Sequence, residues 1–164
     1  SYGCEVNKVA SAMTTNLDFL NRVASEQKYT FVSTGMCTIS DVDKAVEIFR
    51  DHSCDFCLMH SVSIYPANDE DLNLRNIEML RDRYNCDVGY SGHERSVSPS
   101  IVAACLGASV IERHITLDRS MYGSDQSASL EEPGLKSLSA QLQKLPRVLG
   151  SREKVVLDEE LEVA

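Results

Sequence analysis

Short runs of apolar and β-branched residues alternate along the chain with segments in which apolar residues recur at helical spacing. The short runs predict strands at Val6–Ala10, Tyr29–Ser33, Phe56–Val62, Asp87–Tyr90 and Val110–Ile115. These strands start roughly 25 to 30 residues apart, which is the length of one βαβ unit. We therefore expect five β/α units with parallel strands and right-handed crossovers.

The predicted helices carry apolar stripes. Three stripes consist of Val42, Ala45, Val46 and Phe49, of Leu74, Ile77, Leu80 and Tyr84, and of Leu135, Leu138, Leu142 and Leu145. We expect Ser40 to cap the first helix and the acidic residues 69–71 to form the first turn of the second, where the helix dipole favours negative charge. A shorter helix is predicted at Ser100–Ala108, ending near Gly107, and Pro146 predicts a kink or stop in the last helix.

Five such units are compatible with two α/β architectures, an open doubly wound sheet or most of a barrel. Length slightly favours the open sheet, because a complete (β/α)8 barrel takes about 250 residues and this chain has 164. The placement of the polar residues described below favours the barrel.

Composition indicates one globular domain, with 43% hydrophobic and 25% charged residues. No apolar run approaches the roughly 20 residues of a membrane span, and Ser1–Asn7 has neither the basic nor the apolar region of an export signal. We therefore expect a cytoplasmic protein with no membrane partner. A net charge of -9 argues against nucleic acid as a partner.

The cysteines form neither a disulfide framework nor a zinc site by their spacing. They are Cys4, Cys37, Cys54, Cys57, Cys86 and Cys105. Cys54 and Cys57 make the only C-x-x-C pair, and no second pair or histidine follows at finger spacing. We expect reduced thiols that serve as small hydrophobic residues.

Polar residues end every predicted strand. They are Lys8 and Ser11, then Ser33-Thr34-Gly35, then His60, Ser61, Ser63 and Tyr65, then Ser91-Gly92-His93-Glu94, and finally Glu112, Arg113 and His114. Because the carboxyl ends of parallel strands meet at one edge, these residues predict a wide polar pocket built from several strands.

Histidines lie at the ends of two successive strands, at His93 and His114. Adjacent parallel strands are about 4.8 Å apart, so the two imidazoles can share a metal ion. The alternative for each is a hydrogen-bonded structural histidine. We expect a structural role for His60 and a solvated position for His52, in a polar loop between a helix and a strand.

Three other features suit an anionic or sugar ligand. Lys8 lies on an otherwise apolar strand, so we expect it to be buried and to need an anionic partner. Ser33-Thr34-Gly35 is either an anion cradle of hydroxyl and N–H groups or an ordinary turn. Tyr65-Pro66 and the segment 122–125 suit the hydroxyls of a sugar, or are plain surface turns.

Two stretches, 89–94 (GYSGHE) and 106–119 (LGASVIERHITLDR), together with 123–131 (GSDQSASLE), resemble the signature segments of the N-acetylneuraminate (sialic acid) synthase family. Residues 8–11, 33–36 and 63–66 also fall where that family carries site motifs. The resemblance covers essentially the whole chain. It implies a (β/α)8 TIM barrel, of which residues 1–150 supply about the last five units. Residues 151–164 are then expected to be an acidic linker toward a C-terminal antifreeze-like domain that the chain lacks.

The resemblance also implies an activity, a transferase that condenses phosphoenolpyruvate with N-acetylmannosamine or its 6-phosphate and releases phosphate. It implies that His93 and His114 are catalytic residues and bind a divalent metal, with Mn2+ expected and Mg2+ or Co2+ as substitutes. The residues implied to bind the two substrates are Lys8, Ser11, Ser33, Ser63 and Ser91 for phosphoenolpyruvate and Tyr65 and Asp125 for the sugar. The family further implies a homodimer, in which the antifreeze-like domain reaches the partner's site.

The chain departs from the family pattern at several positions. Met13 stands where many relatives have an acidic residue near the sugar, Ser61-Val62 replaces a more usual Cys-Thr or Cys-Asn, and Ser63 stands where some relatives use Asn. The first three β/α units, with their glutamate and lysine, are expected to be missing, so this chain by itself is expected not to turn over.

Two alternatives remain open. The first is a sibling synthase that makes legionaminic acid, pseudaminic acid or a spore-coat polysaccharide. The second is a non-catalytic half-barrel that binds metal or phosphate. The acceptor sugar, its phosphorylation and the metal used in the cell are not determined by the sequence.

Overall fold

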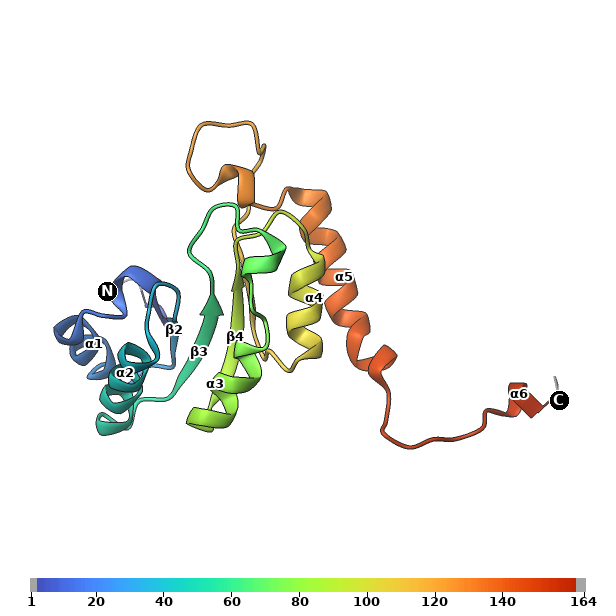
Figure 1. Ribbon diagram of the computed structural model, residues 1–164, viewed down its shortest axis with the longest axis horizontal. Helices are drawn as coiled ribbons and strands as arrows, with labels where there is room; N and C mark the ends of the chain where they lie inside the picture. The colour runs from blue at the N-terminus through green and yellow to red at the C-terminus, as the bar shows by residue number, and fades with distance from the viewer. Residues whose placement is uncertain (1–2, 162–164) are drawn as a thin grey trace.

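The structure is a computed structural model that describes residues 3–161, and its centre is one parallel β-sheet (Figure 1). The strands are β1 (Asn7–Val9), β2 (Thr30–Ser33), β3 (Phe56–Ser61), β4 (Asp87–Gly92) and β5 (Ile111–Arg113). They lie in the order β1-β2-β3-β4-β5, and every neighbouring pair is parallel. The five predicted strands and their parallel order are confirmed.

Helices follow the strands along the chain. They are α1 (Leu17–Ala24), α2 (Ile39–Asp51), α3 (Asn76–Tyr84), α4 (Ser98–Cys105), α5 (Glu132–Leu149) and α6 (Asp158–Leu161), with short 3-10 helices at Ser11–Met13, Asp69–Asp71 and Gln126–Ala128. Figure 1 shows α4 and α5 side by side, and a long loop between β5 and α5 at the end toward which β3 points. Within residues 3–161, no helix is both long and apolar enough to cross a membrane.

The main core forms where alternate strand residues meet the helical stripes. Its largest buried members include Leu20, Phe49, Leu58, Ile77 and Tyr90. Burying one large apolar side chain contributes about 1.5–3 kcal/mol, so these contacts hold the helices against the sheet. The α2 stripe is fully buried and that of α3 nearly so, whereas in the α5 stripe only Leu138 is buried.

The start of α2 differs from the prediction, because Thr38 and not Ser40 is its N-cap. The Thr38 hydroxyl accepts the N–H of Asp41 at 3.3 Å, and the Asp41 carboxylate accepts the N–H of Thr38 at 3.0 Å. Ser40 lacks such a partner three residues later, since the Asp43 carboxylate is hydrogen-bonded to Arg83 on α3. The capping box therefore forms two residues earlier than expected.

Two further expectations about helices are wrong. Residues 69–71 form a separate 3-10 helix, and α3 begins only at Asn76. Pro146 does not stop α5, which continues to Leu149, and the N–H of Gly150 still donates to the Pro146 carbonyl at 3.1 Å. A proline removes its own N–H from the helical ladder and crowds the carbonyl four residues earlier, but here only three residues of α5 follow it.

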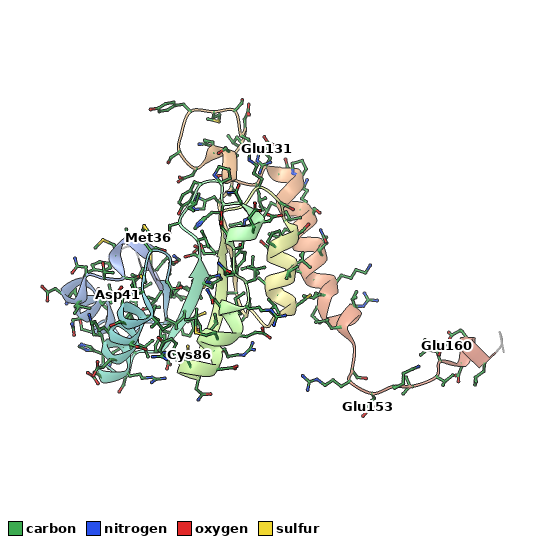
Figure 2. All side chains as sticks on the ribbon, viewed as in Figure 1. Met36, Asp41, Cys86, Glu131, Glu153 and Glu160 are labelled. Carbon is green, nitrogen blue, oxygen red and sulfur yellow. The ribbon has the colours of Figure 1, made fainter. Side chains whose placement is uncertain are left out.

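The sheet curls into a half-barrel. The evidence is a contact between side chains of its two outermost strands. Lys8 Nζ on β1 lies 3.4 Å from Glu112 Oε1 on β5, although three strands separate β1 from β5 in the sheet. The predicted partial-barrel architecture is thus confirmed. Beyond α5 the chain runs away from the sheet, with Glu153 on an extended stretch and Glu160 in α6 (Figure 2). Residues 162–164 of the predicted linker and residues 1–2 lie outside the described residues.

All six cysteines are free. Cys54 and Cys57 are buried in the sheet region, and burial raises the pKa of Cys57 to about 11. Both therefore act as the small hydrophobic residues that were predicted, whereas Cys4 and Cys105 are exposed.

Candidate active site

A hollow of about 320 Å³ lies at the carboxyl ends of the strands, where the sequence predicted a polar pocket. Its lining consists of Lys8, Ala10, Ser11, Ala12, Ser33, Met36, Ser63, Tyr65, Ser91, His93, Glu112 and His114. Every residue that was predicted to bind the metal or a substrate, except Asp125, is in this set. Residues from all five strand ends contribute, because parallel strands bring their carboxyl ends to one edge.

Four other hollows are larger, at about 440 to 520 Å³, and two of them lie at the ends of the strands. One, of about 470 Å³, lies beside the first and shares Met36 and Ser63 with it. The other, of about 520 Å³, lies at the amino-terminal ends of the strands near Asp55 and Cys86, and Figure 2 labels Cys86 at that end. Neither contains His93 or His114, so we take the strand-end hollow as the candidate active site.

Lys8 projects into this hollow and is half-exposed, not buried as we expected. Its Nζ donates to Ser33 Oγ at 2.7 Å and lies 3.4 Å from Glu112 Oε1. The expected anionic partner is therefore present, but the side chain reaches it through the open mouth of the half-barrel. Glu112 also accepts a hydrogen bond from Ser91 Oγ at 2.8 Å, which links three strand ends through one carboxylate.

Three serine hydroxyls surround Gly35. The N–H of Gly35 donates to Ser11 Oγ and to Ser61 Oγ, each at 3.1 Å, and these two oxygens lie 3.2 Å apart. A Cβ added at Gly35 would contact the hydroxyl of Ser63 and would lie 2.8 and 2.9 Å from those of Ser11 and Ser61. The close approach of the hydroxyls therefore requires glycine.

The groups that can bind an anion here are serine hydroxyls, and not the N–H of Gly35 and the hydroxyl of Thr34 that the predicted cradle would use. The Gly35 N–H already has its acceptors, and the Thr34 hydroxyl donates to the Met59 carbonyl at 3.2 Å. A serine that accepts an N–H still has its own proton to donate. Ser63 Oγ is buried and has no hydrogen-bond partner among the described residues, so it is also available to a ligand.

The rings of His93 and His114 meet edge to face at the mouth, with centroids 5.2 Å apart and planes inclined at 68°. Tyr65 packs on both, at 4.3 Å from the His93 ring and 5.6 Å from the His114 ring. His93 Nδ1 donates to the Val62 carbonyl at 2.7 Å, an arrangement that leaves the lone pair on Nε2. Burial lowers the pKa of His93, the Val62 carbonyl opposes this shift, and the facing His114 adds to it.

These two imidazoles fit a divalent metal. A metal about 2.1 Å from one nitrogen of each ring leaves the centroids no more than about 6 Å apart, and the observed 5.2 Å is within that limit. A ligating histidine typically donates its other N–H to a carbonyl or carboxylate, as His93 does to Val62. Within residues 3–161, no group of three or more His, Cys, Asp or Glu side chains is arranged to hold a metal, so a metal at this position would have two histidine ligands from these residues.

Asp125 does not line the hollow, but its carboxylate lies close to the imidazole of His114, which does. Its Oδ2 is 3.7 Å from His114 Nδ1, and both side chains are partly exposed. The loop that carries Asp125 is connected to the strand end by backbone bonds, since the His114 carbonyl accepts the N–H of Leu130 at 2.8 Å. Met13, which stands where many relatives have an acidic residue, is partly buried and packs against the core.

Two polar residues predicted for the pocket lie elsewhere. Glu94 and Arg113 form an ion pair of 2.8 Å and are almost fully buried, with side chains 0% and 2% exposed. They are absent from the lining of the hollow, because successive strand residues point to opposite faces of a sheet. The prediction that all polar residues at the strand ends share one pocket is therefore wrong for this pair.

The remaining histidines are structural. The prediction for His60 is confirmed, because it is buried and its Nε2 donates to the Leu72 carbonyl at 2.7 Å. His52 lies at the C-cap of α2, and its Nε2 is 3.1 Å from Asn21 Oδ1, so it is less solvated than expected.

Sequence reasoning missed three residues as members of the site. Glu112 and Ser61 were seen as polar strand ends but received no role, and Met36 was noted only as part of a motif. The alternation along β5 could have found Glu112, since it lies two residues before His114 and so points to the same face.

Comparison with known proteins gives consistent matches over nearly the whole chain. The model of the NeuB family matches residues 1–154. The N-acetylneuraminate-9-phosphate synthase of Homo sapiens is 38% identical over 92% of this chain and 42% of its own length. The N,N'-diacetyllegionaminic acid synthase of Campylobacter jejuni is 36% identical over 90% of this chain and 45% of its own length.

A solved structure agrees with the same grouping. The N-acetylneuraminic acid (sialic acid) synthetase of Leptospira borgpetersenii superposes with a TM-score of 0.89 at 32% identity, covering 98% of this chain and 56% of that one. The chain spans about half the length of the curated relatives that it matches.

Proposed function

Since the chain belongs to the NeuB family, we propose that the protein condenses phosphoenolpyruvate with N-acetylmannosamine or its 6-phosphate. The reaction releases phosphate and forms a nine-carbon 2-keto acid. The observation that carries the proposal is the pair of adjacent imidazoles, His93 and His114, with ring centroids 5.2 Å apart in a hollow that is also lined by a lysine and several hydroxyls.

The chemistry needs positive charge and proton donors for phosphoenolpyruvate. The chain is acidic, with a net charge of -9, so the binding of a phosphate and a carboxylate depends on local groups. Lys8 supplies the charge and the hydroxyls of Ser11, Ser33 and Ser63 supply donors at the same rim. Ser91, also proposed to bind phosphoenolpyruvate, lies at this rim with its hydroxyl donating to Glu112. Such preorganised donors stabilise anions most strongly where water is excluded.

The bond changes follow from this placement of the substrates. Carbon 3 of phosphoenolpyruvate attacks the aldehyde carbon of the open-chain sugar, and a carbon–carbon bond forms. Water then adds at carbon 2, where positive charge develops, and phosphate leaves by cleavage of its C–O bond. Lys8 and the serines hold the phosphate and the carboxylate in place through both steps.

His93 and His114 would hold a divalent metal, for which we propose Mn2+, with Mg2+ or Co2+ as substitutes. When bound, the ion supplies a Lewis acid for the aldehyde oxygen. His93 contributes Nε2 as a neutral imidazole, because Nδ1 is engaged with Val62 and burial lowers its pKa. Neutral imidazole is the form that binds metal ions.

The acceptor sugar is proposed to contact Tyr65 and Asp125 at the open side of the site. Burial raises the pKa of Tyr65, and the nearby Asp125 and Glu112 raise it further. The phenol therefore stays protonated at neutral pH and can donate a hydrogen bond to a sugar hydroxyl. Asp125 is partly exposed beside His114 and can accept one.

The test is an assay of 2-keto acid formation and phosphate release by the protein expressed over its whole natural reading frame. His114→Ala should abolish turnover, and His52→Ala, far from the hollow, should leave it unchanged. A chelator should remove activity, and added Mn2+ should restore it. Equal activity of His114→Ala and the unaltered protein would exclude the proposed metal site.

A diacetamido sugar is the second candidate acceptor, because the relatives include a legionaminic acid synthase at nearly the same identity as the N-acetylneuraminate-9-phosphate synthase. Competition kinetics between N-acetylmannosamine, its 6-phosphate and the diacetamido sugar distinguish them by kcat/KM. Acceptance of none, with retained metal binding, would instead support a non-catalytic half-barrel.

A further inference from the structure

The buried pair of Glu94 and Arg113 lies directly behind the two imidazoles. Glu94 follows His93 in the chain, and Arg113 precedes His114. Since neighbouring residues of a strand point to opposite faces, the histidines face the hollow while the ion pair lies on the side of the helices. The pair is nearly inaccessible to solvent, at 0% and 2% exposure of the side chains.

Arg113 and Glu94 bind groups from several elements. Arg113 Nη1 donates to Glu94 Oε1 at 2.8 Å, to the Ser96 carbonyl at 2.8 Å and to Ser100 Oγ on α4 at 3.0 Å. The second Glu94 oxygen accepts the Tyr90 hydroxyl of β4 at 2.8 Å. The pair therefore connects β5, β4, the loop that follows β4, and α4.

These bonds lie where the backbone ladder between β4 and β5 has ended. The last paired residues are Gly92 and Arg113, so His93 and His114 lie just past the ladder. Beyond that point Arg113 Nη2 donates to the backbone carbonyl of Glu94. The side chain of Arg113 thus links β5 to β4 beyond the last backbone pairing, next to the two histidines.

The neighbouring glycine preserves the space that the carboxylate needs. A Cβ at Gly92 would lie 2.8 and 2.9 Å from the two carboxylate oxygens of Glu94 and 2.8 Å from the Tyr90 ring. Real Cβ atoms essentially never approach other atoms so closely. The carboxylate of Glu94 can therefore occupy its position only because residue 92 is glycine. The pair and its surroundings therefore leave little freedom of position.

Stability alone does not account for this arrangement. A buried ion pair is often no better for stability than apolar residues of similar volume, and Arg113 Nε is buried with no hydrogen-bond partner among residues 3–161. What a guanidinium adds is a rigid, planar set of donors that fixes several acceptors in one geometry.

We propose that Glu94 and Arg113 are positioning residues that set the separation of the His93 and His114 rings and thereby the affinity of the site for a divalent cation. This inference rests on the proposed function for the role of the two histidines as metal ligands. The residues act through the backbone of the strand ends and touch neither metal nor substrate.

The test replaces Arg113 by lysine, which keeps the charge but cannot bond to a carboxylate, a hydroxyl and two carbonyls in one plane. The dissociation constant for Mn2+ and the visible spectrum of bound Co2+ are measured on the protein expressed over its whole reading frame. We expect Arg113→Lys to weaken Mn2+ binding by about tenfold or more, the usual effect of losing a supporting interaction. The Co2+ spectrum should change as well, because it reports ligand geometry.

Ser100→Ala provides a milder variant that leaves the ion pair intact and removes one bond to Arg113. It should fold, and it should weaken Mn2+ binding severalfold. Ile77→Val, buried on α3 and absent from the network, is the control for general destabilisation. It should lower the melting temperature without changing the Mn2+ affinity.

Each outcome bears on the inference. Mn2+ affinity and Co2+ spectrum equal to those of the unaltered protein in both Ser100→Ala and a folded Arg113→Lys would overturn it. If Arg113→Lys does not fold, Ser100→Ala decides alone. An unaltered protein that binds Mn2+ but does not turn over would contradict the proposed function and leave the positioning role to be judged by the affinities.

Discussion

The hydroxyl of Ser61 at the end of β3 accepts the backbone N–H of Gly35, after the end of β2, at 3.1 Å. Ser11 accepts the same N–H at the same distance from the end of β1. The glycine that follows β2 therefore holds hydroxyls from the ends of the two flanking strands, β1 and β3, around the region proposed to bind phosphoenolpyruvate. Replacing Gly35 or Ser61 by alanine should therefore change the binding of phosphoenolpyruvate.

Gly35→Ala should impair substrate binding more than folding. The new methyl group would be only 2.8 and 2.9 Å from the hydroxyls of Ser11 and Ser61 and would also contact that of Ser63. Overpacking of this kind costs about 1–3 kcal/mol, and the hydroxyls must move to relieve it. We expect the KM for phosphoenolpyruvate to rise about tenfold or more, measured by steady-state kinetics alongside urea unfolding.

The matched control is Gly134→Ala in α5. There an added Cβ meets only Leu130, at 3.5 Å or more. Alanine is favoured over glycine in a helix by about 0.5–1 kcal/mol, so this variant should be slightly more stable with unchanged kinetics. An unchanged KM in Gly35→Ala would show that the hydroxyl cluster does not contact the substrate.

Ser61→Ala should have a smaller effect, because Gly35 keeps Ser11 as an acceptor. Loss of one neutral hydrogen bond costs about 0.5–1.5 kcal/mol, so we expect about a 3- to 10-fold rise in the KM for phosphoenolpyruvate with kcat retained. Ser109→Ala, whose hydroxyl donates to the Val88 carbonyl, loses a similar bond outside the hollow and should keep the original KM. Equal KM values in the two variants would contradict the role of Ser61.

The strands and the helical stripes of α2 and α3 could be predicted because local composition determines them. β-branched and apolar runs such as Thr30–Ser33 have few alternatives to a buried strand, and the stripe of α2 requires a helix to bury it. The strand ends were also predictable, since parallel topology brings His93 and His114 to one edge.

Other features depend on tertiary contacts that no local pattern encodes. Asp43 binds Arg83 on another helix, so Ser40 could not cap α2 as expected. Contact between Lys8 and Glu112 requires the curl of the whole sheet. Arg113 was predicted to line the pocket because it is polar and ends a strand. Its side chain points to the opposite face of the sheet from that of His114.

Lys8→Met should reduce kcat/KM strongly while leaving folding nearly intact. Hydrogen bonds to charged groups contribute about 1.5–3 kcal/mol, which corresponds to a loss of about 10- to 100-fold. The pair with Glu112 is partly exposed on both sides, and such pairs contribute at most about 1 kcal/mol to stability. Steady-state kinetics and thermal unfolding of the same samples separate the two effects.

Lys136→Met provides the corresponding control. Lys136 pairs with Glu132 on the surface of α5, and its side chain is 75% exposed. Removing this charge should change neither kinetic constant. If it lowered kcat/KM as much as Lys8→Met does, the effect would come from the overall charge of the protein and not from a contact in the hollow.

Stability should fall in mild acid, partly because of His60. Burial lowers the pKa of His60, and the bond to the Leu72 carbonyl only partly opposes the shift. Below the unfolded pKa of about 6.5, the unfolded chain binds a proton that the folded protein resists. The stabilisation is therefore present above about pH 6.5 and is lost as the pH falls through the lower folded pKa.

Urea unfolding at a series of pH values between about 5 and 8 tests this assignment. His60→Gln should reduce the dependence of the unfolding free energy on pH, because the amide can still donate toward Leu72 but does not titrate. Some dependence will remain, since burial also lowers the pKa of His93. A slope in His60→Gln as steep as in the unaltered protein would assign the acid sensitivity to other groups, because only a residue that titrates differently in the folded and unfolded states can contribute to it.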